Sequence, residues 1–326
     1  MLLIFYSGTR ISNILHSLIT YLPQNKLGFV IDTSNVLDLS GTQMNLCLRA
    51  LIHGLMRVEY TSTYRIFKFL KKFEYRKTQL QFTDLDLAIS IFLTEEINLK
   101  GKKFSEIIEQ IRAQFSIDAQ IIPVCEEVLP ISLKLGTKTT DYLEYIRSNN
   151  SDIKFQEVSF NGYEEKKPNE RLKEMANKSE YILLLPNDLI GFHAMLQVPG
   201  VRKILEDVPC PIFAICPITG SNIITEKQIN VLSKMGYAEI NALEFVKTVE
   251  NLADTIIIDE SQKDYKEPIQ KLGFQVNIGN LAIKNKTESF ELASYLFNLF
   301  PLKETVKPSK ASAVSRFFNR LVKKKI

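Results

Sequence analysis

The stretch LLIFYSGTRISNILHSLITYLPQNKLGFVIDTSN, residues 2–35, decides the fold class. An apolar run at 2–6 ends in small residues at 7–9, and apolar residues at helical spacing follow over 11–19. A second apolar run fills 27–31. A strand, a helix and a second strand within about 30 residues are typical of a right-handed βαβ unit in a parallel sheet. The stretch therefore predicts an α/β protein.

The same alternation of strands and helices returns in the second half of the chain. Apolar runs of strand length occur at 120–124, 181–185, 212–216, 255–258 and 274–278. Helical patterns lie near 169–177, 200–206, 226–235, 242–251 and 287–299. Runs that are apolar throughout fit strands that helices cover on both faces. We therefore predict a Rossmann-like, three-layer α/β core with a parallel sheet, formed by residues 1–42 and 116–300.

Residues 43–115 differ from the core, because they show helical periodicity and no good strand. We predict that they form a helical subdomain inserted into the core. Within it, residues 57–77 contain seven basic residues interleaved with aromatic ones, and Tyr60, Tyr64 and Phe67 share one face at helical spacing. Two interpretations stay open: an amphipathic helix with a solvated basic face, or a patch for an anionic ligand or partner.

The positive charge of the chain is concentrated at its C-terminus. Of 326 residues, 41 are Lys or Arg and 37 are Asp or Glu, which gives a net charge of +4. Seven basic residues and no acid lie beyond residue 306, so the remainder carries −3 and we expect no nucleic-acid partner. We predict that 301–326 form a basic amphipathic tail that contacts an anionic membrane or a protein partner; the alternative is a frayed tail.

Composition and cysteine content exclude several classes of protein. With 45% hydrophobic and 24% charged residues, the chain is typical of globular proteins and not of disordered ones. Its four cysteines form no CxxC pair and its three histidines show no paired spacing, so we expect neither a disulfide scaffold nor a zinc site. The chain has no uncharged apolar run of about 18 residues. We expect a cytoplasmic protein with buried free thiols.

Small, hydroxylated, amide and acidic residues follow the predicted strands. The carboxyl ends of parallel strands form one edge of the sheet, and ligands bind there. Backbone N–H groups at helix starts suit phosphate, and paired carboxylates suit Mg²⁺. The residues expected at this edge are Ser7, Gly8, Thr9, Arg10, Asp32, Thr33, Ser34, Asn35, Glu126, Glu127, Asn187, Asp188, Thr219, Gly220, Asp259 and Glu260. The alternative interpretation is that they are ordinary turn and capping residues.

The order of these loops resembles the motifs of one family. The segments FYSGTRISNIL, VIDTSNVLDLSG, FTDLDLA, IIPVCEEV, ILLLPNDLIGFHAMLQVPGVRKIL, CPITGSN and IIIDE are similar, in order and spacing, to those of the 2-phospho-L-lactate transferase (CofD) family. The bacterial gluconeogenesis-factor (YvcK-like) proteins are related to that family. The resemblance runs over roughly residues 2–300 and implies a Rossmann-like fold with a helical part.

The resemblance also implies an activity. The family's transferases move a phospholactyl or phosphoenolpyruvyl group from a guanylyl donor onto the deazaflavin alcohol FO. They require Mg²⁺ and make the precursor of coenzyme F420. The family is often dimeric, so a homodimer is expected by analogy.

Particular residues receive roles from this resemblance. The residues implied in substrate binding are Gly8, Thr9, Asp32, Thr33, Ser34, Asn187, Thr219 and Gly220. Asp84 and Asp86 are implied as catalytic carboxylates, and Glu126 and Glu127 as ligands of Mg²⁺. Arg10 and Arg49 stand where the family has a glycine and an acidic segment. We interpret both arginines as replacements that bind phosphate directly.

Departures from the family pattern leave two functions open. Ser7 and Arg10 replace glycines of the first loop, Leu46 to Arg49 replace the acidic segment, and the chain has no tryptophan. We predict a divergent Mg²⁺-dependent transferase that moves a phospholactyl- or phosphoenolpyruvyl-type group from a nucleotidyl donor to FO or a similar hydroxyl acceptor. The alternative is a non-catalytic regulatory protein that binds a nucleotide sugar or a deazaflavin. A partner subunit of a true transferase is a third option.

Overall fold

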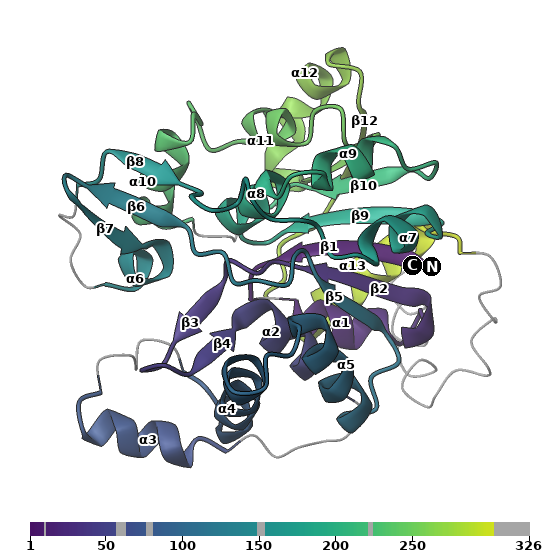
Figure 1. Cartoon of the computed structure of the whole chain (residues 1–326). Coiled ribbons are helices and arrows are strands. Elements are labelled where there is room, and N and C mark those ends of the chain that lie inside the picture. Colours follow the sequence, from purple (N-terminus) through teal and green to yellow (C-terminus); the bar gives the residue numbers. More distant parts are fainter. Residues whose placement is uncertain (10, 57–62, 76–80, 149–153, 221–223, 303–326) are drawn as a thin grey trace.

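A seven-stranded parallel sheet forms the centre of the molecule in the computed structural model (Figure 1). The structure describes residues 1–9, 11–56, 63–75, 81–148, 154–220 and 224–302. In spatial order the strands are β12 (Gln275–Gly279), β11 (Thr255–Asp259), β10 (Ile212–Ile215), β9 (Tyr181–Pro186), β1 (Leu2–Ser7), β2 (Leu27–Ile31) and β5 (Gln120–Pro123). The predicted α/β, Rossmann-like fold is therefore confirmed.

Strand β1 shows why the sheet lies in the middle of the molecule. All six of its residues are buried. Leu3 and Phe5 point into one hydrophobic core, and Leu2, Ile4 and Tyr6 point into the other, because successive side chains of a strand face opposite sides. An apolar run of this kind is stable only where helices cover both faces.

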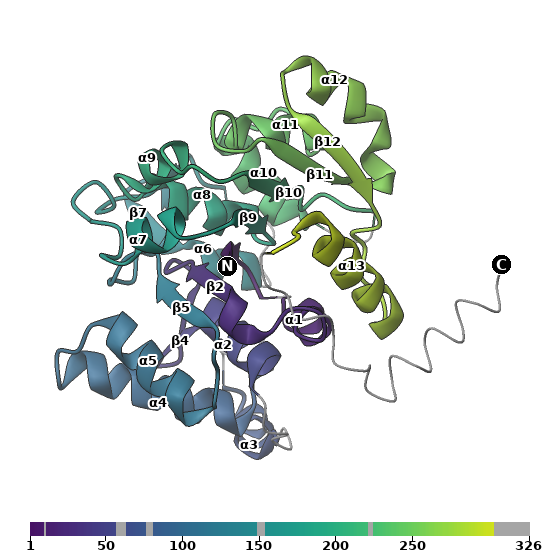
Figure 2. The same cartoon turned by 90° about the vertical axis from the view of Figure 1, so that its right-hand side faces the viewer.

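Helices cover the two faces of the sheet as two outer layers (Figure 2). One face is covered by α1 (Ser12–Leu18), α2 (Leu46–Leu55), α5 (Phe104–Gln114) and α13 (Lys286–Leu299). The other is covered by α7 (Leu172–Asn177), α8 (Leu189–Gln197), α9 (Val201–Glu206) and α11 (Ala242–Thr248). The remaining short elements are η1 (Gln24–Lys26), η2 (Glu260–Tyr265) and α12 (Lys266–Lys271). No helix within the described residues is long and apolar enough to cross a membrane.

The segment between β2 and β5 is mainly helical, with one correction to the sequence prediction. It contains α2, α3 (Arg65–Lys72), α4 (Asp84–Asn98) and α5, but also β4 (Gln43–Asn45), which pairs with β3 (Val36–Asp38). The prediction of no strand in 43–115 was wrong, because a three-residue strand is too short to show a two-residue period. Gln43 N–H donates to Thr94 Oγ1 at 2.8 Å and so ties this hairpin to α4.

Helix α3 has no buried residue. The helix begins at Arg65, so Tyr64 precedes it and does not share with Phe67 the helical face that the spacing predicted. Tyr60 lies outside the described residues. The side chains of Phe69 and Phe73 are 58% and 78% exposed beside basic residues of the helix. Most of the predicted tail, residues 303–326, also lies outside the part that the structure describes.

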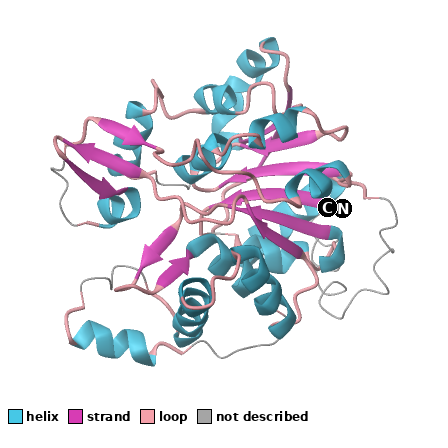
Figure 3. Cartoon of the chain, in the orientation of Figure 1, coloured by secondary structure: helices cyan, strands magenta, loops and turns pink. Residues whose placement is uncertain are grey.

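A small antiparallel sheet, absent from the sequence prediction, is formed by the chain between β5 and β9 and lies to one side of the central sheet (Figure 3). We call it the small lobe: β6 (Ser132–Leu135), β7 (Lys138–Asp141), β8 (Glu157–Ser159) and α6 (Tyr142–Arg147). Its strands are short and largely polar, so they lack the apolar runs that mark the central strands. Tyr142 N–H donates to Ile131 O at 2.8 Å, and Asp141 caps the first turn of α6.

Besides the apolar packing of Leu143 and Tyr145, one lysine ties the small lobe to the core. Lys227, on α10 (Glu226–Lys234), donates from Nζ to Tyr145 O at 3.1 Å, to Ser148 O at 2.6 Å and to Ser148 Oγ at 2.8 Å. A cation at the carboxyl end of α6 satisfies carbonyl groups that the helix leaves unpaired. The position of α6 against α10 therefore depends on this side chain.

We predict that Lys227→Met loosens the small lobe. Loss of hydrogen bonds from a charged donor should lower the free energy of unfolding by about 1–2 kcal/mol and speed amide hydrogen exchange in residues 142–148. Urea denaturation and hydrogen-exchange mass spectrometry measure both effects. Lys234→Met, at an exposed position on the same helix, is the control. Equal exchange in the two variants would contradict the assignment.

Candidate functional site

The strand order reverses between β1 and β9, and a cleft of about 160 Å³ opens at the carboxyl ends of these two strands. Ligands of open parallel sheets bind at such a point, because the loops that follow the two strands diverge to opposite faces. Gly8 and Thr9 line the cleft from the β1 side, and Asn187 and Asp188 line it from the β9 side. Three predicted binding residues are thus brought together here: Gly8, Thr9 and Asn187.

Gly8 is required by the close approach of these two loops. Its φ is +119°, and a Cβ atom there would lie 2.9 Å from both Asn187 Cβ and Asp188 N. A side chain at this position would strain the backbone and push the β9 loop away. The backbone conformation and the close contact therefore both require glycine at position 8, which also lines the cleft.

The cleft has an apolar wall and a polar end. Its apolar lining is contributed by Leu46, Leu143, Ile146, Leu189, Ile190, Pro217, Ile224 and Leu232. Its polar lining includes Thr9, Asn35, Tyr142, Arg147, Asn187, Asp188 and Gln228. Three helices, α2, α8 and α10, begin beside it. Their amino-terminal ends favour negative charge in the cleft.

A buried hydrogen-bond network forms the floor of the cleft. Asn35 Nδ2 donates to Asp32 Oδ2 and, at 3.1 Å, to Asp188 Oδ2, so one amide joins two carboxylates. Ser7 Oγ donates to Asp32 Oδ2 at 3.1 Å, and Tyr142 OH lies 3.4 Å from Asp188 Oδ1. Asp188 also caps α8 by accepting from Ile190 N–H at 3.2 Å. Residues from β1, β2, β9 and the small lobe therefore meet in one cluster.

Gly191, in the first turn of α8, packs directly against this network. A Cβ atom on Gly191 would lie 2.3 Å from Asp32 Oδ2, 2.4 Å from Asn35 Nδ2 and 2.4 Å from Ser7 Oγ. The first turn of α8 can therefore pack on the polar cluster only where the side chain is absent. This contact explains a glycine inside a helix, where it is otherwise unfavourable.

The two carboxylates of the network are difficult to ionise together. Burial raises the pKa of Asp32 to about 6, and the Asp188 charge adds to this, although hydrogen bonds from Ser34 and Asn35 oppose it. Burial likewise raises the pKa of Asp188 against hydrogen bonds from Asn35, Gly191 and Ile190. The cluster can therefore hold a proton in the weakly acidic range.

Other predicted residues of the sheet edge have structural roles. Thr33 and Ser34 are buried: Thr33 Oγ1 contacts Cys125 Sγ at 3.3 Å, and Ser34 N–H donates to Asp32 Oδ1 at 2.7 Å. Thr219 and Gly220 follow β10 and do not line the cleft. Gly220 N–H donates instead to Asp259 Oδ1 at 3.3 Å, and Arg10 lies outside the described residues.

Asp84 lies at the base of α3, away from the cleft lining. Its carboxylate accepts from Thr63 Oγ1 at 2.6 Å and from the N–H groups of Arg65 and Ile66 at 3.3 and 3.0 Å. The Thr63 hydrogen bond is the main cause that lowers the pKa of Asp84. The carboxylate thus caps the start of α3, although Asp84 follows that helix start by about twenty residues in the sequence.

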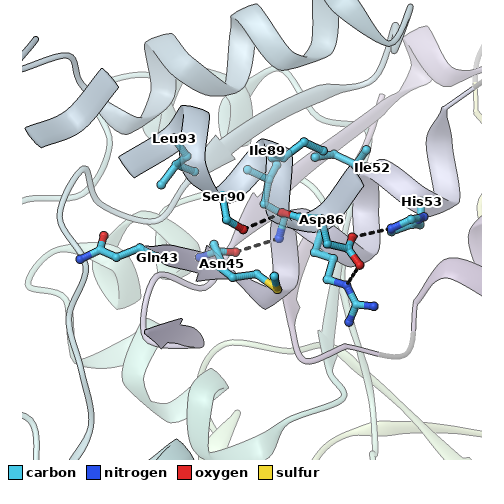
Figure 4. Close-up of a pocket in the computed structure, with 11 residues that line it drawn as sticks. Gln43, Asn45, Ile52, His53, Asp86, Ile89, Ser90 and Leu93 are labelled. Atoms are coloured by element: carbon cyan, nitrogen blue, oxygen red, sulfur yellow. Dashed lines mark hydrogen bonds and ion pairs between the residues drawn. The ribbon is translucent and has the colours of Figure 1, made fainter. Parts of the chain in front are cut away.

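Asp86, on the first turn of α4, forms an ion-pair cluster with Arg49 and His53 of α2. Figure 4 shows Asp86 and His53 side by side. Asp86 Oδ2 is 2.9 Å from Arg49 Nε, and Asp86 Oδ1 is 2.6 Å from His53 Nε2. Burial by itself raises the pKa of Asp86, but the His53 hydrogen bond, the Arg49 charge and the Thr83 N–H together lower it to about 2. The space beside these residues is about 10 Å³, enough for at most one water molecule.

The predicted metal ligands Glu126 and Glu127 follow β5. Glu126 Oε1 accepts from Asn169 Nδ2 at 2.6 Å and Glu126 Oε2 from Ser105 N–H at 2.9 Å, so both of its oxygens are engaged. Glu127 is exposed and pairs with Lys166 at 3.4 Å. No group of three His, Cys, Asp or Glu residues that could hold a metal occurs among the described residues. The glutamate pair, as arranged here, does not fit a magnesium site.

Three polar lining residues could not be assigned from the sequence, and one of them, Gln228, lies on α10. Tyr142 and Arg147 belong to α6 of the small lobe, which follows no central strand. The rule that ligands bind after strands therefore gives no signal for them. Asn35 and Asp188 follow predicted strands and were expected at the same edge of the sheet, but no pattern in the sequence predicts the hydrogen bond between them.

The fold and the cleft define the class of protein: a Rossmann-like α/β protein whose ligand site lies at the switch point between β1 and β9. A family model described as 2-phospho-L-lactate transferase CofD matches residues 8–286. The chain belongs to the CofD family, as the resemblance of its loops predicted.

Individual relatives are distant. The chain is 20% identical over 308 residues to the 2-phospho-L-lactate transferase of Methanosarcina acetivorans, covering 92% of this chain and 99% of that protein. It is 21% identical over 197 residues to the phosphoenolpyruvate transferase of Streptomyces griseus, covering 59% of this chain and 62% of that protein. A crystal structure of a UPF0052-family protein from Bacillus halodurans has the same fold, with a TM-score of 0.63, 14% identity, and coverage of 90% and 98%.

We predict that Asp32 makes stability depend on pH. Its folded pKa of about 6 exceeds the unfolded value of about 3.9, so the folded state binds more protons between these values. The free energy of unfolding should therefore fall, by roughly 3 kcal/mol, as the pH rises from about 4 to about 6. Asp32→Asn should remove this loss. Urea unfolding of both proteins at pH 4.5 and 7.5 tests it, and parallel pH dependences would contradict it.

Proposed function

We propose that this chain is a transferase that binds a nucleotidyl or otherwise phosphorylated donor at the switch-point cleft and transfers its acidic phosphorus-containing group to a hydroxyl acceptor. The observation that supports this most is the convergence of the Gly8–Thr9 loop, Asn187 and the starts of three helices on one cleft. Such a site favours phosphate. The relatives named as phospholactate and phosphoenolpyruvate transferases support the class of reaction.

The residues of the cleft suggest how transfer would proceed. Phosphoryl-type transfer depends mainly on positioning and on neutralising charge. The acceptor oxygen would form a bond to phosphorus while the bond from phosphorus to the leaving nucleotide breaks. The proton of the acceptor hydroxyl would pass to Asp188, the acidic residue among the described residues that line the cleft. The acceptor hydroxyl would take the place of Tyr142 OH, whose contact with Asp188 Oδ1 is long at 3.4 Å. The burial that raises its pKa favours a carboxyl able to hold that proton.

Magnesium would shield phosphate charge if a bound donor supplied most of its ligands, since Mg²⁺ often binds through substrate phosphates. The carboxylates of Glu126 and Glu127 are engaged elsewhere and do not provide its site. FO remains our proposed acceptor, and a phospholactyl- or phosphoenolpyruvyl-type group remains the proposed group transferred.

A second candidate function is a binding protein without turnover. It is favoured by the engagement of Asp84 in the cap of α3 and of Asp86 in the Arg49–His53 cluster, since these acids were the predicted catalytic pair. Such a protein would use the same cleft for a nucleotide sugar or a deazaflavin. Homodimer formation and contact of the tail with an anionic membrane or a protein partner stay predictions from the sequence.

The discriminating experiment is a titration of the full chain with FO, followed by FO fluorescence, with and without Mg²⁺ and a guanylyl donor. We expect binding and formation of a charged product. Asp188→Asn should keep binding, because asparagine also caps helices, but slow product formation by about 100-fold or more. Asp207→Asn, whose aspartate forms an exposed ion pair with Lys203, is the matched control.

The outcomes separate the candidates. Binding without product would favour the binding protein, and no binding of FO would overturn the proposed acceptor. Product formation by Asp188→Asn at the rate of the Asp207→Asn control would remove Asp188 from the reaction.

A further inference from the structure

Arg147 is a half-buried cation whose hydrogen bonds are incomplete. It ends α6 of the small lobe and lines the switch-point cleft. Its Nη1 atom is buried and has no hydrogen-bond partner, and the guanidinium forms no ion pair with any residue that the structure describes. A buried donor that lacks an acceptor costs free energy, more so on a charged group. An acceptor supplied by a ligand would remove this cost.

The charges near Arg147 only partly compensate for its burial. Burial lowers the pKa of the Arg147 guanidinium, the charges of Asp141, Tyr142 and Asp188 oppose that change, and the positive charge of Arg49 adds to it. Two arginines therefore act on the same region. Arg49 is held in place by the ion pair with Asp86. An anion bound at Arg147 in the cleft would offset this unfavourable positive charge.

The position of Arg147 is set before any ligand binds. Lys227 binds the carbonyl groups at the end of α6, and α6 packs against α10 through this contact. Gln228, on the first turn of α10, lines the same cleft. The backbone that carries Arg147 is therefore held in place, so that binding an oxyanion has to order only the side chain.

The size of the cleft limits what Arg147 can bind. A volume of about 160 Å³ is below the range of about 300–1,000 Å³ that is typical of sites enclosing a whole drug-sized ligand. The cleft therefore encloses one small charged group, and the remainder of a nucleotide or a three-ring acceptor bound there would extend out of it. The apolar wall formed by residues such as Leu143 and Ile146 would contact the carbon atoms next to that group.

We propose that Arg147 recognises the oxyanion, phosphoryl or carboxylate, of the small acid group that the protein transfers or binds. This inference rests on the proposed function for the identity of the group, but not for the existence of the anion site. Arg147 is thus a binding and specificity-determining residue supplied by the small lobe.

The test measures anion binding by the full chain without any acceptor. Inorganic phosphate and acetate are titrated separately by isothermal calorimetry, and their effects on the melting temperature are recorded. We expect one of them to bind the wild type and raise its melting temperature. Arg147→Met should weaken that binding by about 10–100-fold, and Arg147→Lys should weaken it less, because lysine keeps the charge but loses the planar fork.

Matched controls separate binding from folding. Arg171→Met removes an exposed arginine that pairs with Glu109 at 2.8 Å outside the cleft, and should leave anion binding unchanged. A purely structural role for Arg147 predicts a lower melting temperature of Arg147→Met without anion, together with an unchanged anion-induced rise. That result, or anion binding equal to the wild type, would overturn the proposal.

The two anions distinguish the kind of group that Arg147 binds, and the FO assay tests the proposed function separately. Stabilisation by phosphate assigns a phosphoryl group to Arg147, and stabilisation by acetate assigns a carboxylate. Absence of binding by both anions in the wild type would overturn the inference. Arg147-dependent binding with no product in the FO assay would leave this inference standing and defeat the transferase proposal alone.

Discussion

The parallel pairing of β1 with β9 is the interaction on which the rest of the structure depends. It joins the first βαβ unit to the second half of the chain, with Leu2 opposite Tyr181 and Ser7 opposite Pro186. Because β2 continues the sheet on one side and β10 on the other, the loops after β1 and β9 leave in opposite directions. The cleft is a consequence of that reversal and not of any single residue.

The same pairing forces polar groups into the interior. Ser7, at the end of β1, and Asp188, just after β9, are brought beside Asp32 and Asn35 from the end of β2. Two carboxylates in such a position are unfavourable unless hydrogen bonds or a proton compensate them. Asn35 and Gly191 make the cluster possible, one by donating to both acids and the other by leaving room for them. A costly polar floor beneath a cleft is typical of a site maintained for binding or chemistry.

The sequence predicted the central strands because each is an apolar run bounded by turn residues, which is a local signal. It also placed Gly8, Thr9 and Asn187 together, since the ends of parallel strands share one edge. It did not predict the small lobe, whose strands are short and polar, and so it missed Arg147 and Tyr142. The roles of Asp84 and Asp86 were equally hidden, because their partners Thr63, Arg49 and His53 are distant in sequence and no local pattern links them.

A crystal structure of the chain with bound GDP would show where the donor binds. We expect phosphate density against the Gly8–Thr9 loop and Asn187, beside the guanidinium of Arg147. Phosphate density against Arg49 and Asp86 between α2 and α4, with the switch-point cleft empty, would contradict it.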